Sequence, residues 1–166
     1  LFPYTTLFRS DNGNGVFGDP CAPPDTAAGD SELVPFGGDS LYIASGAQLA
    51  YADRHPCPRL FVSGEDTWEL AFDTASGKLS MTPAENGGAE LSLAAAPDWL
   101  ALCGAGDARA VLMHNPGESV QLPPGTYRMA DYRLTRKDAK AARWLLEARA
   151  TGATAPVELA ASGAAL

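Results

Sequence analysis

This chain has few of the residue types on which catalysis and metal binding most often depend. Its 166 residues include only two histidines, His55 and His114, and three cysteines. The sequence has no GxSxG, HExxH or Walker motif, so the commonest signatures of hydrolases, zinc proteases and phosphate-binding loops are missing. We predict that His55 is a loop residue and that His114 lies at the end of a strand as a solvent-exposed residue of the following turn. Cys57 near His55 would lack a third group to orient the pair. We therefore expect no catalytic residues and no enzyme.

Long apolar runs and positive charges are also scarce. No run approaches the roughly 18 to 20 apolar residues that span a bilayer, so we expect no transmembrane segment. Twelve Lys and Arg stand against 20 Asp and Glu, which gives a formal net charge of −8 at pH 7. Because so acidic a chain repels a phosphate backbone, we expect no nucleic-acid partner.

Glycine and proline are abundant, with 17 and 13 copies, while charged residues make up 19% of the chain. This composition favours a turn-rich β protein of an extracytoplasmic compartment. The predicted fold class is all-β, an antiparallel β-sandwich with a loop-rich N-terminal segment. Besides the segments discussed below, strands are expected at 40–44, 58–63, 89–94, 98–103, 108–114, 118–122 and 126–135.

Residues 67–82 carry the clearest hairpin pattern. Trp68, Leu70 and Phe72 alternate with polar residues, which places three large apolar side chains on one face of a strand. Apolar residues with the same alternation follow a turn that contains Gly77. We predict an antiparallel hairpin with one buried face.

Residues 138–150 allow two interpretations. An N-cap aspartate followed by good helix formers predicts a helix. A hairpin that turns at 138–142 would instead place Trp144, Leu146 and Ala148 on one strand face. The segment directly follows strand-like residues, and we favour the hairpin.

The first ten residues, LFPYTTLFRS, resemble the conceptual translation of a sequencing-library adapter. We expect residues 1–10 to be non-native and the native chain to begin near Asp11. Residues 11–38, rich in Gly, Asp, Pro and Ala, predict a loop or linker, and residues 39–166 predict the sandwich domain. A strand-like segment at 156–159 lies close to the last residue, which raises the hypothesis that this domain is truncated at its C-terminus.

Residues 120–129, VQLPPGTYRM, form two alternating segments around a Pro-Gly turn. With Val120, Leu122 and Tyr127 as its apolar positions, this piece is similar to the closing hairpin of carboxypeptidase-regulatory-like domains. That resemblance implies a small prealbumin-type sandwich of a secreted bacterial protein. Such sandwiches usually support another domain.

The strand after this turn departs from the family pattern. Tyr127 and Met129 share one face, whereas Tyr132 and Leu134 fall on the other. A β-bulge near Ala130–Asp131 would reconcile the two phases.

Residues 11–19, DNGNGVFGD, are similar to the calcium loops of EF-hand and dockerin-like segments. In that alignment Ser10 stands where an aspartate is expected, and Cys21 stands where a bidentate carboxylate is expected. The loop is therefore degenerate, and a Gly/Asn-rich turn that binds no ion is the alternative. The calcium ligands that the resemblance implies are Asn12, Asn14, Val16 and Asp19.

Cys21 and Cys57 lie beside prolines in polar segments, whereas Cys103 ends the apolar run WLALC. We predict a Cys21–Cys57 disulfide, which would indicate an oxidising compartment and hence a periplasmic or secreted protein. The alternative is three unpaired thiols.

Positive charge is concentrated in one segment. Residues 128–149 hold seven cations against three carboxylates, a net charge of +4 on an otherwise acidic chain. This segment fits contact with a neighbouring acidic domain or a cell-surface polymer, although a solvated hairpin is the simpler interpretation.

Two function hypotheses remain. The leading one is a non-enzymatic, extracytoplasmic structural or interaction module of a larger secreted or envelope protein. The alternative is a carbohydrate-binding module, which would need two or more aromatic side chains exposed on one sheet. The aromatic residues in question are Trp68, Trp99, Tyr127, Tyr132 and Trp144.

Overall fold

A computed structural model of the chain contains strands and no helix within the residues that it describes. The all-β prediction is confirmed. Within the same residues there is no helix able to cross a membrane. The described residues are 5–9, 19, 21, 38–44, 54–73, 75–76, 78–85, 88–104, 109–149, 155–160 and 164–165.

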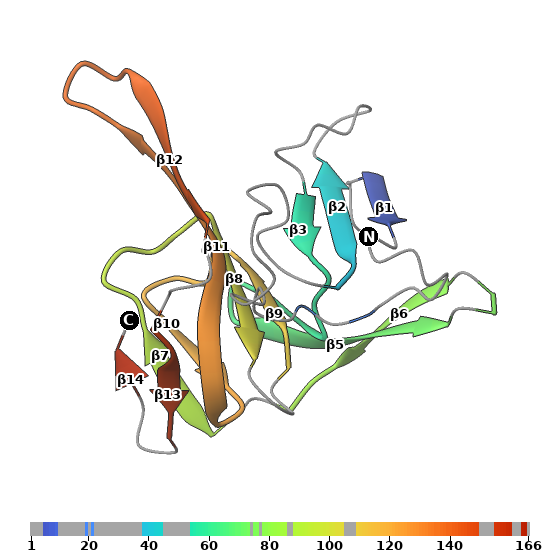
Figure 1. Ribbon diagram of the computed structural model, residues 1–166. Helices are drawn as coiled ribbons and strands as arrows, with labels where there is room; N and C mark the ends of the chain where they lie inside the picture. The colour runs from blue at the N-terminus through green and yellow to red at the C-terminus, as the bar shows by residue number, and fades with distance from the viewer. Residues whose placement is uncertain are drawn as a thin grey trace, which may run out of the picture.

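The strands form a large sheet and two smaller ones (Figure 1). The first small sheet has the order β1 (Thr5–Arg9), β2 (Ser40–Ala44), β3 (Arg54–Pro56). The large sheet has the order β12 (Arg143–Arg149), β11 (Gly125–Lys137), β8 (Trp99–Gly104), β9 (Val111–His114), β4 (Leu60–Ser63), β5 (Asp66–Asp73), β6 (Lys78–Pro83), with β13 (Val157–Leu159) also on β11. The second small sheet has the order β10 (Ser119–Leu122), β7 (Ala89–Ser92), β14 (Ala164–Ala165).

The large sheet is buried on both faces at its centre. Along β8, Leu100 and Leu102 face one apolar core, whereas Ala101 and Cys103 face a second. The first core lies between the large sheet and the β7–β10 pair, and the second includes Leu41 of β2. Because both faces of these strands meet apolar neighbours, the central strands carry nearly continuous apolar runs.

Several predicted elements are confirmed. The hairpin at 67–82 is β5 and β6, in which Leu70 pairs with Met81 and Phe72 pairs with Leu79. The register of β11 against β8 shifts between Met129 and Asp131, where we predicted a bulge. The strand-like segment 156–159 contains β13.

Other features differ from the expectations or lie outside them. β3 was predicted to be loop, and two strand pairs, β4 with β9 and β14 with β7, are parallel. β1 lies within residues 1–10, and its backbone pairs with β2. This pairing does not test where the residues come from, so the non-native origin of residues 1–10 stays a prediction. Most of segment 11–38 lies outside the described residues.

Because the central strands of the large sheet are buried on both faces, we expect their side chains to contribute strongly to stability. Leu112 of β9 is 0% exposed in the second core. Replacing Leu112 with alanine should lower the free energy of unfolding by about 2–5 kcal/mol, because the lost methyl groups leave a cavity. Leu145→Ala is the control, since Leu145 is 56% exposed and a surface truncation should change stability by less than about 0.5 kcal/mol. Urea unfolding measures both, and equal losses would contradict the layer arrangement.

Candidate functional site

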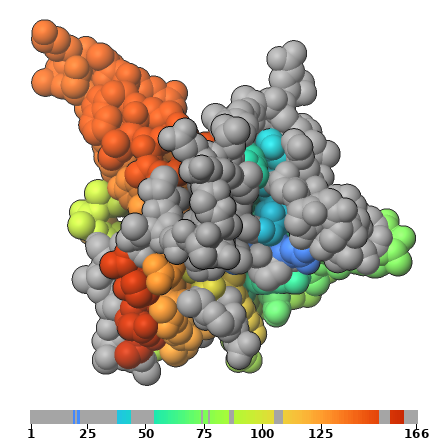
Figure 2. All heavy atoms as spheres, in the orientation of Figure 1, coloured from blue at the N-terminus to red at the C-terminus, as the bar shows by residue number. Residues whose placement is uncertain are grey.

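The hairpin of β11 and β12 extends past the rest of the large sheet (Figure 1). β8 accompanies β11 only as far as the pair Arg133–Trp99. Beyond this point β11 pairs with β12 alone, as far as Lys137 opposite Arg143. We name the two-stranded part, residues 134–146, the arm. Figure 2 shows its turn end projecting past the other described residues. At its base, the Thr135 amide donates to the Asp98 carboxylate at 2.6 Å and the Arg136 guanidinium donates to the Ala96 carbonyl at 2.8 Å.

The arm turns through an aspartate-capped loop. The Asp138 carboxylate accepts backbone hydrogen bonds from Lys140 at 2.8 Å and from Ala142 at 2.9 Å. The Asp138 amide donates to the Ala142 carbonyl at 3.0 Å, and Ala141 takes a positive φ of 61°. The aspartate that resembled a helix N-cap therefore caps a turn. The hairpin interpretation of residues 138–150 is confirmed.

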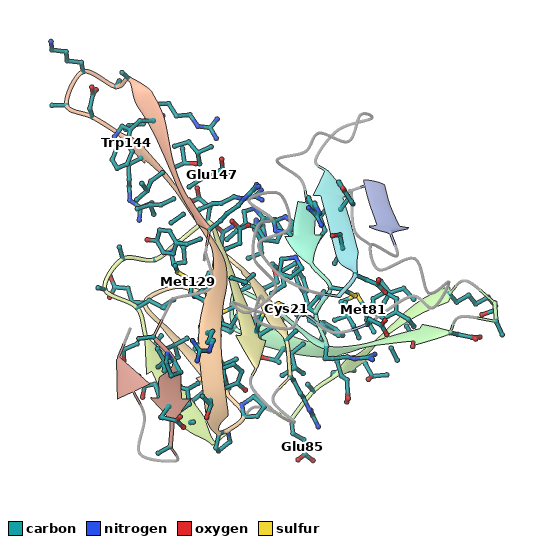
Figure 3. The ribbon with its side chains drawn as sticks, in the orientation of Figure 1. Cys21, Met81, Glu85, Met129, Trp144 and Glu147 are labelled. Atoms are coloured by element: carbon teal, nitrogen blue, oxygen red, sulfur yellow. A yellow bond between two sulfur atoms is a disulfide. The ribbon has the colours of Figure 1, made fainter. Side chains whose placement is uncertain are left out.

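Three large apolar side chains of the arm are exposed, whereas Leu134 at its base is buried. Trp144 and Leu146 are each 46% exposed and share one face of β12, as expected from the alternation. Leu145, 56% exposed, points to the other face. Figure 3 shows Trp144 and Glu147 on opposite sides of β12. The arm thus presents apolar surface on both faces.

The arm is also basic. Four of its residues are cations and one is a carboxylate, so its net charge is +3. Removing this +3 from the chain's −8 leaves −11 on the remaining residues. The cations are Arg136, Lys137, Lys140 and Arg143.

A buried charge network lies where the arm joins the sheet. Arg133 of β11 is 7% exposed, and its guanidinium lies 3.0 Å from the Asp131 carboxylate and 3.2 Å from the Glu147 carboxylate of β12. Its Nη2 also donates to the Arg54 carbonyl of β3 at 2.9 Å. Arg149 of β12 approaches the same two carboxylates at 3.7 Å and 3.8 Å. These contacts join β11, β12 and β3.

An aromatic stack continues from this network. His55 Nδ1 lies 3.9 Å from the Asp131 carboxylate, and the His55 ring stacks on Trp99 with 4.4 Å between centroids. Trp99 in turn stacks on His114 at 4.3 Å. His55 is 1% exposed within β3, so the prediction of a loop residue is wrong. His114 ends β9, so its predicted place at a strand end is confirmed, but its side chain is half-buried rather than solvent-exposed.

Burial sets the charge state of this network. It lowers the pKa of His55 to about 3, with further lowering by the charges of Arg133 and Arg149. Burial raises the pKa of Asp131, and the same two arginines oppose that rise. His55 is therefore neutral at pH 7. The ion pairs that hold the base of the arm against the sheet are those between the two arginines and the two carboxylates.

The pKa of His55 predicts a pH dependence of stability. Since its folded pKa of about 3 lies below its usual 6.5, the unfolded chain takes up the proton first as the pH falls. The free energy of unfolding should fall by about 2 kcal/mol between about pH 6.5 and 5 from this group. The raised pKa of Asp131 acts in the opposite sense, because the folded chain takes up that proton first as the pH falls. Urea unfolding of His55→Gln across this window should show a flatter pH dependence. An unchanged slope would refute a neutral, buried His55.

The disulfide joins Cys21 to Cys103, whose Cα atoms lie 5.3 Å apart, so the predicted Cys21–Cys57 pairing is wrong. Cys103 faces the second core, where Cys21 packs, because of the alternation along β8. Cys57 is a buried free thiol, and burial, followed by the charge of Asp39, raises its pKa to about 12. A thiol with this pKa stays protonated at neutral pH.

One predicted calcium ligand lies among the described residues. The Asp19 amide donates to the Asp39 carboxylate at 2.9 Å, and the Asp39 amide donates to the Asp19 carbonyl at 3.1 Å. Asn12, Asn14 and Val16 lie outside the described residues. No group of three or more metal-ligating side chains is found in the part of the chain that the structure describes. Calcium binding stays a prediction.

A groove lies between the β4–β5 turn and the loop from β9 to β10. Its volume is about 450 Å³, which is within the range of ligand-sized pockets. Among the described residues that line it, Glu65 and Glu118 are the charged ones, and Pro116 and Val120 supply an apolar wall. Sequence reasoning missed this groove, because it forms between turns that are about 50 residues apart in the chain.

No family model, curated protein or solved structure matches this chain. The resemblance to carboxypeptidase-regulatory-like domains and the resemblance to EF-hand and dockerin-like loops therefore stay predictions.

Proposed function

We propose that this chain is a non-enzymatic interaction module of a larger secreted or envelope protein, and that its arm binds an acidic protein partner. The observation that carries the proposal is the combination of exposed Trp144, Leu145 and Leu146 with a net charge of +3 on a projecting hairpin. Trp and Arg are the residue types that contribute most often to binding hot spots. An acidic neighbouring domain, one of the partners considered from the sequence, would have the complementary charge.

Energetics support a partner for the arm. A two-stranded ribbon is marginally stable in water on its own. Apolar side chains that stay exposed to water do not contribute the free energy that burial against a partner would supply. The contacts of Arg133 with Asp131, Glu147 and β3 hold the base of the arm in place before any partner arrives. A preformed arm loses less conformational entropy on binding.

The disulfide supports the extracytoplasmic part of the proposal. Cys21 and Cys103 are both almost fully buried, and their bond links the N-terminal segment to the large sheet. Structural disulfides persist in oxidising compartments such as the periplasm or the cell exterior. The first measurement for this part is the oxidation state of the chain isolated from its native compartment.

The carbohydrate-binding alternative receives less support. A sugar platform needs several exposed aromatic rings on one sheet face. Of the five aromatic residues considered, Tyr127 is buried, and Trp68, Trp99 and Tyr132 are partly buried. Trp144 alone of the five is exposed, which fits a protein contact better than a sugar platform.

Poly-L-glutamate is a suitable acidic probe for this proposal. In about 0.1 M salt, where the Debye length is about 10 Å, the full chain should bind the polymer through the arm. Lys140→Glu combined with Arg143→Glu should weaken binding at least about tenfold, because it reverses two arm charges. Fluorescence of Trp144 and isothermal titration calorimetry report the binding.

The matched control is Lys78→Glu combined with Arg109→Glu, which makes the same change in net charge at two exposed residues outside the arm. This control should bind the polymer within about twofold of the unmodified chain, since distant charges are screened. Equal weakening in both variants, or no binding by the unmodified chain, would contradict an arm-centred interaction.

A further inference from the structure

The groove and the arm have opposite charges. The described residues that line the groove include two carboxylates, Glu65 and Glu118, and no Lys or Arg. The arm holds four cations and one carboxylate. Glu65 and Glu118 are both exposed, so their charges are accessible to a partner. Opposite charges of this kind select partners and fix their register.

The groove and the arm also complement each other in apolar surface. Pro116 is buried, and Val120 is 7% exposed, so the groove has an apolar wall beside its carboxylates. Trp144 of the arm is 46% exposed and is flanked by the cation Arg143. An aromatic side chain next to a cation suits an apolar pocket with an acidic rim.

We propose that the partner of the arm is a second copy of this chain, and that the arm of one copy binds the groove of another. This inference rests on the proposed function, because it names the acidic partner that the arm binds. Lys140 and Arg143 of one copy would face Glu65 and Glu118 of the other, with Trp144 against Pro116 and Val120. The net charge of −8 opposes association at long range, but salt screens that repulsion beyond about 8 Å at physiological ionic strength.

A charge-swap experiment on the full chain tests this contact. The arm variant combines Lys140→Glu with Arg143→Glu, and the groove variant combines Glu65→Lys with Glu118→Lys. Sedimentation equilibrium should show concentration-dependent self-association of the unmodified chain. Each variant alone should associate at least about tenfold more weakly, because arm and groove then carry the same sign.

An equimolar mixture of the two variants should recover association, because each arm then meets a groove of opposite sign. This recovery also shows that both variants are folded. A closed dimer and a longer chain of copies would both support the proposal. A monomeric unmodified chain, variants that associate like the unmodified chain, or a mixture that fails to associate would overturn it.

The poly-L-glutamate titration separates the two proposals. If the arm binds the polymer but the unmodified chain stays monomeric, the second copy is not the partner, and the proposed interaction module stands. If the arm binds neither the polymer nor a second copy, the proposed function fails as well.

Discussion

Replacing Cys103 with alanine is expected to lower the free energy of unfolding by about 2–5 kcal/mol. The Cys21–Cys103 bond spans a sequence separation of 82 residues, so its loss frees a long loop in the unfolded chain. The bond also fixes Cys21 in the second core beside β8. Urea unfolding of the oxidised protein measures the loss.

Cys57→Ala is the matched control for the disulfide. Cys57 is also buried, but it is a free thiol, so its variant should keep the response to reductant. A reductant should destabilise the unmodified chain and the Cys57→Ala variant alike, and it should have no further effect on Cys103→Ala. If Cys57→Ala instead abolishes the response to reductant, then the pairing through Cys103 is wrong.

Asp131→Ala should destabilise the fold by about 3–5 kcal/mol. Asp131 is 2% exposed and forms ion pairs with Arg133 and Arg149. In the variant both arginines lose this carboxylate, and Arg133 remains buried. Arg133 keeps the Glu147 carboxylate and the Arg54 carbonyl, but it loses the nearer of its two carboxylates, so part of the cost of burying its charge is no longer offset. Thermal unfolding and urea unfolding both report the change.

Asp66→Ala is the control for Asp131, since Asp66 is an exposed carboxylate on β5. Its replacement should change the free energy of unfolding by less than about 0.5 kcal/mol. In addition, Asp131→Ala should speed amide exchange in β12, whereas Asp66→Ala should not. Equal stability of the two variants would show that the charge network does not hold the base of the arm.

Local pattern was sufficient to predict much of the fold. The alternation of Trp68, Leu70 and Phe72 identifies the β5 strand because a half-buried strand repeats every two residues. The change of phase after Met129 located the bulge, since only an inserted residue returns the apolar side chains to one face. The hairpin at 138–150 was predicted against its helix propensity, because the segment directly follows strand-like residues and because of the resemblance to carboxypeptidase-regulatory-like domains.

Long-range placement was not predictable in this way. β3 consists of Arg54, His55 and Pro56 and therefore resembles a loop in sequence. It nevertheless pairs with β2 at the edge of a small sheet, where proline is tolerated. Cys21 pairs with Cys103 because the Cys103 side chain points to the face of β8 on which Cys21 packs. The residues around Cys103 are all apolar, so the sequence does not show to which face its side chain points. The charge network joins residues of β3, β11 and β12 that are up to 95 positions apart, from Arg54 to Arg149.

Amide hydrogen exchange of β12, measured on the full chain with and without poly-L-glutamate, tests the central claim most directly. If the arm is a preformed hairpin that binds an acidic partner, β12 amides paired with β11 exchange slowly in the free chain and more slowly with the polymer. Exchange of these amides at the rate of an unfolded chain, or no change on adding the polymer, would contradict the claim.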